Sequence, residues 1–154
     1  MLIHETLVRE RCFYGVPGNS KKRVLEHASE LIAEQSPDLD SEQIFAGLIG
    51  RERLGSTGIG EGIAIPHCRL ESCTKPTGTL LRLKEPVDFD AIDGQAVDLL
   101  FVLLVPLEAT EAHLQTLAAL AEMFNNAGVR DLLRSTESAE QLYQTTVDYE
   151  RARL

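Results

Sequence analysis

An uninterrupted apolar run constrains the fold more than any other part of this sequence. It holds the nine residues 99–107 and is closed by Asp98 on one side and Glu108 on the other. A membrane helix needs about 20 apolar residues, so the run is far too short to cross a bilayer. Leu, Val and Phe fill it without polar alternation, as is typical of a strand covered on both faces. We therefore predict a central strand over about 97–105.

Apolar residues at helical spacing on both sides of this run supply the covering layers. One helix is predicted over about 20–35, and a second from about 41 until the pattern breaks at Gly55. After the run, Thr110 is placed to cap a helix over 113–124, and one or two further helices follow, the last over about 138–149.

The remaining segments complete a sheet. A second strand is expected over 78–83, and the short apolar run 63–65 leads toward His67. The residues 15–18, Gly-Val-Pro-Gly, are interpreted as a turn. No internal repeat or linker divides the chain, and helices flank apolar strands on both sides. The sequence thus predicts a single α/β sandwich domain over residues 1–154.

Composition excludes several classes of protein. A quarter of the residues are charged and 44% are hydrophobic, which is ordinary for a globular domain. The net charge of −9 disfavours nucleic acid as a partner, because phosphate backbones need clustered Lys and Arg. The first ten residues carry Glu5, Arg9 and Glu10 where a signal peptide needs apolar residues. Three cysteines without a CxxC pair fit a reducing compartment. We expect a cytoplasmic protein with no membrane insertion.

The segment 55–70, GSTGIGEGIAIPHCRL, is the one that points to chemistry. Four of the 11 glycines fall within residues 55–62, and the N–H groups of such a loop can form an anion-binding nest. Pro66 stiffens the approach to His67, which we expect just past the end of a strand. An ordinary turn beside a surface histidine explains the same spacing, because the nucleotide-binding motifs GxGxxG and GK[ST] are both absent.

Two further side chains gain meaning beside His67. His113 falls in the first turn of a predicted helix, where the helix dipole favours a neutral imidazole and attracts anions. Its alternative role is packing at the start of that helix. Arg51 ends a helix just before the glycines, and its planar guanidinium suits phosphate. Its alternative role is to complement the helix dipole, and Arg53 competes with it for the phosphate.

Metal and thiol chemistry have less support. His67, Cys68 and Cys73 form a partial zinc set, but their spacing fits no standard pair and the sequence offers no fourth ligand. We therefore expect neither a metal nor another cofactor. A nucleophilic Cys68 would need His67 beside it, yet adjacent residues of a strand point to opposite faces.

The residues 58–68, GIGEGIAIPHC, closely resemble the active-site signature of the EIIA domains of the bacterial phosphoenolpyruvate-dependent phosphotransferase system, mannitol/fructose type. The residues 51–57, RERLGST, and 20–27, SKKRVLEH, resemble the nitrogen-regulatory branch, the IIA-Ntr or PtsN proteins. The resemblance continues through 111–115, EAHLQ, and the C-terminal helices, so it covers nearly the whole chain.

This resemblance implies a fold and a site. The fold it implies is a mixed central β-sheet flanked by helices on both sides. His67 matches the phosphoryl-accepting histidine of the family, His113 its supporting second histidine, and Arg51 its active-site arginine. Backbone N–H groups of the glycine loop are expected to supply further donors to the phosphoryl oxygens: Gly58, Gly60 and Gly62.

The resemblance also implies partners. The phosphoryl donor is expected to be a histidine phosphocarrier protein of the HPr or NPr type. The phosphorylation state would then regulate target proteins, which in the family include potassium-transport and sensor-kinase proteins. Two alternatives remain open, namely a sugar-specific EIIA that passes the phosphoryl group to a membrane EIIB/EIIC, and a binding module that works without phosphorylation.

Overall fold

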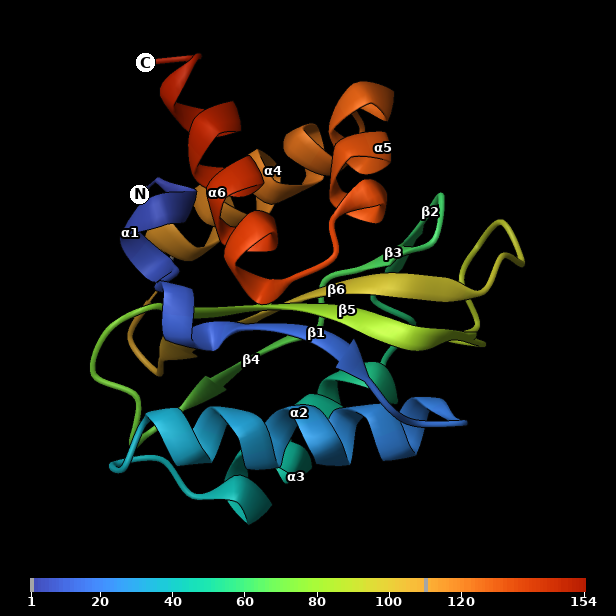
Figure 1. The fold of residues 1–154 in the computed structure, drawn as a ribbon. Helices are drawn as coiled ribbons and strands as arrows, with labels where there is room; N and C mark the ends of the chain where they lie inside the picture. Colours follow the sequence, from blue (N-terminus) through green and yellow to red (C-terminus); the bar gives the residue numbers. More distant parts are fainter. Residues whose placement is uncertain (1, 110) are drawn as a thin grey trace.

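A six-stranded sheet forms the centre of the computed structural model, which describes residues 2–109 and 111–154. Its strands are β1 (Cys12–Val16), β2 (Gly58–Gly60), β3 (Ile63–Ala64), β4 (His67–Leu70), β5 (Thr77–Val87) and β6 (Val97–Pro106). They lie in the order β1-β5-β6-β3-β2, and β4 also pairs with β6 (Figure 1). The sheet is mixed, because β5 and β6 are antiparallel while β1 is parallel to β5 and both β3 and β4 are parallel to β6.

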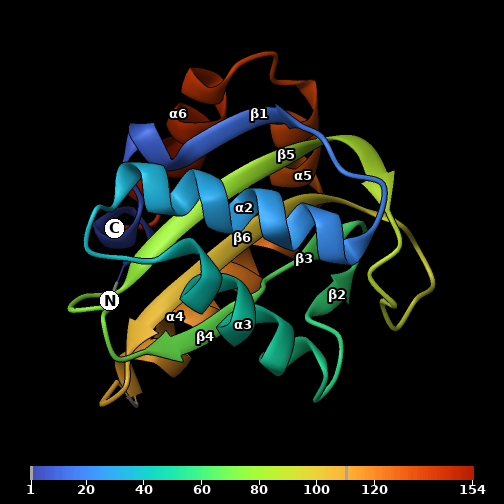
Figure 2. The same cartoon turned by 90° about the horizontal axis from the view of Figure 1, so that it is seen from below.

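Helices cover both faces of this sheet. They are α1 (Ile3–Thr6), α2 (Lys21–Gln35), α3 (Ser41–Glu52), α4 (Glu111–Phe124), α5 (Ala127–Ser135) and α6 (Ala139–Arg151). Helices α2 and α3 lie on one face, and α1, α4, α5 and α6 lie on the other (Figures 1 and 2). The predicted α/β sandwich with a mixed central sheet is confirmed. Within the described residues, no helix is long and apolar enough to span a membrane.

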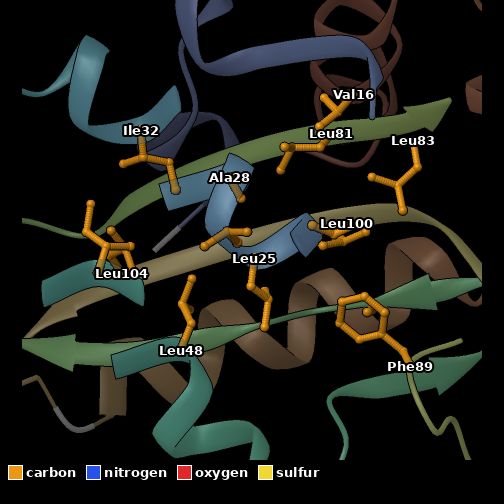
Figure 3. Close-up of a cluster of buried hydrophobic side chains, with 14 of the residues drawn as sticks. Val16, Leu25, Ala28, Ile32, Leu48, Leu81, Leu83, Phe89, Leu100 and Leu104 are labelled. Atoms are coloured by element: carbon orange, nitrogen blue, oxygen red, sulfur yellow. The ribbon is translucent and has the colours of Figure 1, made fainter. Parts of the chain in front are cut away.

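The apolar run occupies β6 and packs on both sides, as predicted. Leu100, Val102 and Leu104 belong to the hydrophobic cluster under α2 and α3, part of which is drawn in Figure 3. The residues between them belong to the second cluster, under α4, α5 and α6. Because successive side chains of a strand alternate between faces, a strand buried on both sides needs an apolar residue at every position. This requirement explains the unbroken run.

Side-chain caps mark where several helices begin. The Ser20 hydroxyl accepts a hydrogen bond from the backbone N–H of Arg23 at 3.2 Å, and Ser138 caps α6 in the same way. Two helices follow α4, and the last begins and ends within two residues of the prediction. The predicted cap Thr110 lies outside the described residues.

One prediction about the strands is wrong. Residues 15–18 were predicted to form a turn, but Gly15 and Val16 belong to the edge strand β1 (Cys12–Val16). Its partner β5 lies more than 60 residues later in the chain, so no local sequence pattern predicts the pairing. His67 follows the end of β3 by three residues, as predicted, and it also opens the strand β4, which was not predicted and which continues along β6 after β3.

Candidate functional site

His67 is half-buried at the start of β4, immediately after Pro66. Its Nδ1 lies 2.8 Å from the carbonyl oxygen of Ile65. A carbonyl can only accept a hydrogen bond, so Nδ1 carries the ring proton. The lone pair of the neutral imidazole is therefore on Nε2, and that nitrogen is the nucleophilic atom of the ring.

The surroundings of His67 keep the ring neutral. Burial is the main cause that lowers its pKa below 6.5, and the positive charge of Arg51 lowers it further. The hydrogen bond to the Ile65 carbonyl and the negative charge of Glu52 act in the opposite direction. Because the net direction is downward, the imidazole of His67 is uncharged at pH 7.

His113 lies in the first turn of α4 and is brought next to His67. The two ring centroids are 5.6 Å apart and the ring planes are inclined by 50°. Burial lowers the pKa of His113, and it is lowered further by the charge that His67 would carry if protonated and by the charge of Arg69. Its Nδ1 is buried and has no hydrogen-bond partner among the described residues. The site thus pairs two neutral imidazoles, one of which has an unused polar nitrogen.

Arg51 lies in the last turn of α3. Its Nη1 donates a hydrogen bond to the carbonyl oxygen of Gly55 at 2.8 Å, which holds the side chain against the start of the next segment. Its positive charge acts to lower the pKa of His67. Arg53 is exposed on the cap of α3. The structure therefore brings His67 and His113 together, and Arg51 acts on His67 through its charge.

Two charged residues of this region were missed from the sequence. Arg69 lies two positions after His67 in β4, on the same face of the strand, and its charge lowers the pKa of His113. Alternation along a strand would have indicated it, had β4 been predicted. Glu52 is a buried carboxylate that receives hydrogen bonds from Thr57 and Lys21. Because a glutamate at a helix end is ordinarily exposed, its burial had no signal in the sequence.

The glycines predicted to bind a phosphoryl group lie along the hairpin of β2 and β3. Gly58 and Gly60 belong to β2, and Gly62 lies in the hairpin turn with a φ of 78°. Gly62 is followed by four residues of extended chain, roughly 13 Å, before His67 is reached, whereas Gly58 is opposite Ala64, three residues before His67. The binding of a phosphoryl group by these glycines stays a prediction.

The glycines of the hairpin also have a packing role. A Cβ at Gly62 would lie 2.5 Å from Nη2 of Arg134, and one at Gly58 would lie 2.9 Å from the Cβ of Ala91. The left-handed φ at Gly62 is strained for any residue with a side chain. The glycines allow a tight turn and a close approach of neighbouring segments.

Comparison with known proteins decides the family of this chain. The model of the family "Phosphoenolpyruvate-dependent sugar phosphotransferase system, EIIA 2" matches residues 6–147. The chain belongs to this EIIA family. Its helices on both sides of a mixed sheet are the fold that the resemblance implied.

Relatives of this EIIA protein include nitrogen regulatory proteins. It is 55% identical over 146 residues to the nitrogen regulatory protein of Pseudomonas aeruginosa, and the match covers 95% of each chain. The crystal structure of IIA-Ntr from Neisseria meningitidis is 41% identical, with a TM-score of 0.86, covering 94% of this chain and 98% of that one. The predicted resemblance to the nitrogen-regulatory branch is confirmed.

A more distant structure shows the same fold. Escherichia coli IIA mannitol, solved in complex with phosphorylated IIB mannitol, aligns with a TM-score of 0.76 at 21% identity. The alignment covers 92% of this chain and 97% of that one.

Cys68 is turned away from the two histidines of this EIIA protein. Its side chain packs in the cluster under α2 and α3, where its Sγ would lie 2.8 Å from a Cβ placed on Gly47. Burial raises the pKa of its thiol to about 12, so the thiol stays protonated at pH 7. Cys68 is therefore not a nucleophile of this site. Among the described residues, no group of three or more His, Cys, Asp or Glu side chains is arranged to hold a metal.

Proposed function

We propose that this EIIA protein is a phosphoryl carrier that accepts a phosphoryl group on Nε2 of His67. The observation that carries the proposal is the hydrogen bond from Nδ1–H to the Ile65 carbonyl, which leaves the Nε2 lone pair free for attack. The donor is a phosphohistidine protein of the HPr or NPr type, in the cytoplasm.

The chemistry needs no general base. The Nε2 lone pair of His67 forms a bond to phosphorus while the nitrogen–phosphorus bond of the donor histidine breaks, and that bonding pair returns to the donor ring. The proton on Nδ1 stays in its hydrogen bond to Ile65 throughout. Charge stabilisation and positioning are then the main tasks of the protein. Arg51 and His113 supply donors for the phosphoryl oxygens.

Phosphorylation is proposed to act as the signal. A phosphoryl group adds about −1.5 to −2 charge at neutral pH. It would appear beside Arg69, which is exposed, and near Leu114, whose exposed fraction is 62% on the same helix as His113. A target that binds this surface in the unphosphorylated form would lose complementarity. The similarity to nitrogen regulatory proteins supports regulatory targets, with potassium-transport and sensor-kinase proteins as the classes to test.

Radiolabelling tests the site. Incubation with labelled phosphoenolpyruvate, enzyme I and HPr should label the wild-type protein, and His67→Ala should abolish the label. His27→Ala is the matched control, because His27 lies on α2, away from the ring pair, and should label normally. Label that survives in His67→Ala would refute the assignment of His67.

Transfer to a sugar-transporting EIIB is the second candidate function. The observation that favours it is the shared fold with Escherichia coli IIA mannitol, which was solved in complex with phosphorylated IIB. Labelled protein mixed with candidate EIIB domains decides between the two roles. Rapid loss of label to an EIIB would establish transport, while retention of label together with phosphorylation-dependent target binding would establish regulation. Target binding that phosphorylation does not alter would favour a binding module instead.

A further inference from the structure

A buried carboxylate lies at the start of a hydrogen-bond chain that ends on His67. Glu52 is the last residue of α3, and only 8% of its surface is exposed. Its two carboxylate oxygens accept the backbone N–H of Thr57 at 3.3 and 3.2 Å, and Oε1 also accepts the Thr57 hydroxyl. The end of α3 and the segment before β2 are therefore fastened to each other through one side chain.

Lys21 supplies the counter-charge from another element. It is the first residue of α2, and its Nζ lies 2.9 Å from Oε2 of Glu52. The same ammonium lies 3.6 Å from Asp90 and 5.3 Å from the centre of the Phe89 ring. A buried ion pair is retained at a desolvation cost, so it is weak evidence for stability and better evidence for a fixed geometry.

The chain continues from Thr57 to the imidazole. The carbonyl oxygen of Thr57 accepts the backbone N–H of Ile65 at 3.0 Å. The carbonyl oxygen of Ile65 then accepts Nδ1–H of His67 at 2.8 Å. Glu52 fixes Thr57, Thr57 holds Ile65 through its backbone N–H, and the carbonyl of the same residue decides which ring nitrogen of His67 holds the proton.

Glu52 acts on His67 through its negative charge as well as through the hydrogen-bond chain. It raises the pKa of the ring, opposite to the effect of Arg51. When Nε2 bonds to phosphorus, the ring keeps its Nδ1 proton and becomes cationic. The negative charge of Glu52 stabilises that cation as it forms.

We propose that Glu52 is a positioning residue for phosphoryl transfer, which holds the Ile65 carbonyl through Thr57 and thereby keeps the proton of His67 on Nδ1. Lys21 pairs with the carboxylate and holds it in place. The inference rests on the proposed role of His67, and it adds a residue that touches neither the phosphoryl group nor the ring.

Glu52→Gln tests the inference with two readouts. In the 15N spectrum of the free protein, the wild type should show a single tautomer of His67 with the proton on Nδ1, and Glu52→Gln should show a mixture of tautomers. The rate of labelling from phosphorylated HPr should fall roughly tenfold or more. The spectrum needs no phosphoryl donor, so it reports on the hydrogen-bond chain even if the donor has been wrongly chosen.

Glu150→Gln is the matched control. Glu150 is also a buried glutamate that accepts backbone N–H groups, but its partners are Ile3 and His4 in α1. It should leave the His67 tautomer and the labelling rate unchanged while lowering the melting temperature. Equal effects of the two variants on the labelling rate would show a general loss of stability and overturn the inference.

Thr57→Val tests the positioning role of Glu52 if Glu52→Gln does not fold. It keeps the backbone bonds of Thr57 and removes only the hydroxyl that donates to Glu52, so a smaller slowing, roughly fivefold, is expected with the same change of tautomer. A wild-type tautomer and rate in whichever of these two variants folds would overturn the inference. An unlabelled wild type, or a labelled His67→Ala, would instead refute the proposed function.

Discussion

Two buried glutamates on opposite faces of the sheet perform similar tasks with different consequences. Glu52 is 8% exposed and Glu150 is 7% exposed, and each accepts backbone N–H groups. Glu150, in α6, binds the N–H groups of Ile3 and His4 at 2.6 and 2.7 Å and also contacts Nδ1 of His4 at 2.7 Å. It therefore fastens the N-terminal helix to the C-terminal one.

The two glutamates differ in where their hydrogen bonds lead beyond the first partner. The bonds of Glu150 end at His4, which is exposed at the beginning of the chain. The bonds of Glu52 continue through Thr57 and Ile65 to the reactive ring. Burial and hydrogen bonding alone therefore do not distinguish a structural carboxylate from one that serves a site, whereas the end of the hydrogen-bond chain does.

The largest effect is expected from Lys21→Met, which leaves Glu52 buried without its counter-charge. The Lys21 side chain is 19% exposed and that of Glu52 is 4% exposed, so solvent screens the lost interaction poorly. Breaking a buried pair by removing one partner costs about 3–5 kcal/mol. Urea unfolding should show a loss of this size. The double variant Lys21→Met/Glu52→Met should recover much of it, because no charge is then left buried; failure to recover would mean that the pair itself contributes the stability.

A smaller loss, about 2 kcal/mol, is expected from Glu150→Ala, because it leaves the N–H groups of Ile3 and His4 without acceptors. Labelling of His67 should proceed at the wild-type rate at a temperature where the variant is folded. A labelling rate that falls along with stability would erase the contrast between the two glutamates.

The sequence predicts those helices and strands whose pattern lies within the segment itself. The run in β6 and the helices from α2 onward were predicted correctly, because periodicity and capping residues report on each segment alone, whereas the four-residue helix α1 was not predicted. The strand β1 was missed because Phe13 and Val16 are stabilised by pairing with β5, and that contact joins distant parts of the chain. β2 and β4 have only three and four residues, too few for a period to appear.

The residues of the site also differ in whether the sequence could predict them. The proximity of His67 and His113 was expected from the family resemblance, and the 5.6 Å between their rings agrees with it. The role of the glycines stays a prediction, because a glycine cluster indicates a tight turn as readily as an anion site, and the strand register places Gly62 farther from His67 than Gly58. Glu52 was missed because its burial depends on Lys21, which approaches from another helix.

The pH dependence of His67 sharpens the contrast further. The pKa of His67 is below 6.5 in the folded protein, mainly through burial, so labelling should persist as pH falls and be lost only below 6.5. Glu52 raises this pKa, so Glu52→Gln should lower it further, whereas Glu150→Gln should leave it unchanged. An NMR titration of the His67 ring in the three proteins measures both effects. A higher pKa in Glu52→Gln would contradict the charge effect assigned to this carboxylate.

The same shift has a consequence for stability. The unfolded chain takes up a proton near pH 6.5, while folded His67 does not until its own lower pKa is reached. In that window the unfolded state binds more protons, so the free energy of unfolding falls as pH falls from 6.5 to the pKa of folded His67. Below the pKa of folded His67, this contribution to the free energy of unfolding is constant. His113 adds to the effect in the same window, because its pKa is also lowered. Urea unfolding between pH 7 and 5 should show this decline, and it should be weaker in His67→Gln.

The smallest effect is expected at Cys68, which adjoins His67 in β4 but faces the cluster under α2 and α3. It shares that region with Glu52 yet lies outside the hydrogen-bond chain that leads to the ring. Cys68→Ala removes a half-buried sulfur beside Gly47 and should cost about 1 kcal/mol or less in urea unfolding. Labelling of His67 should not change, because the thiol neither bonds to the ring nor ionises at pH 7. If Cys68→Ala slowed labelling as much as Glu52→Gln, packing against β4 would be the determinant of His67 geometry, and the hydrogen-bond chain would not be.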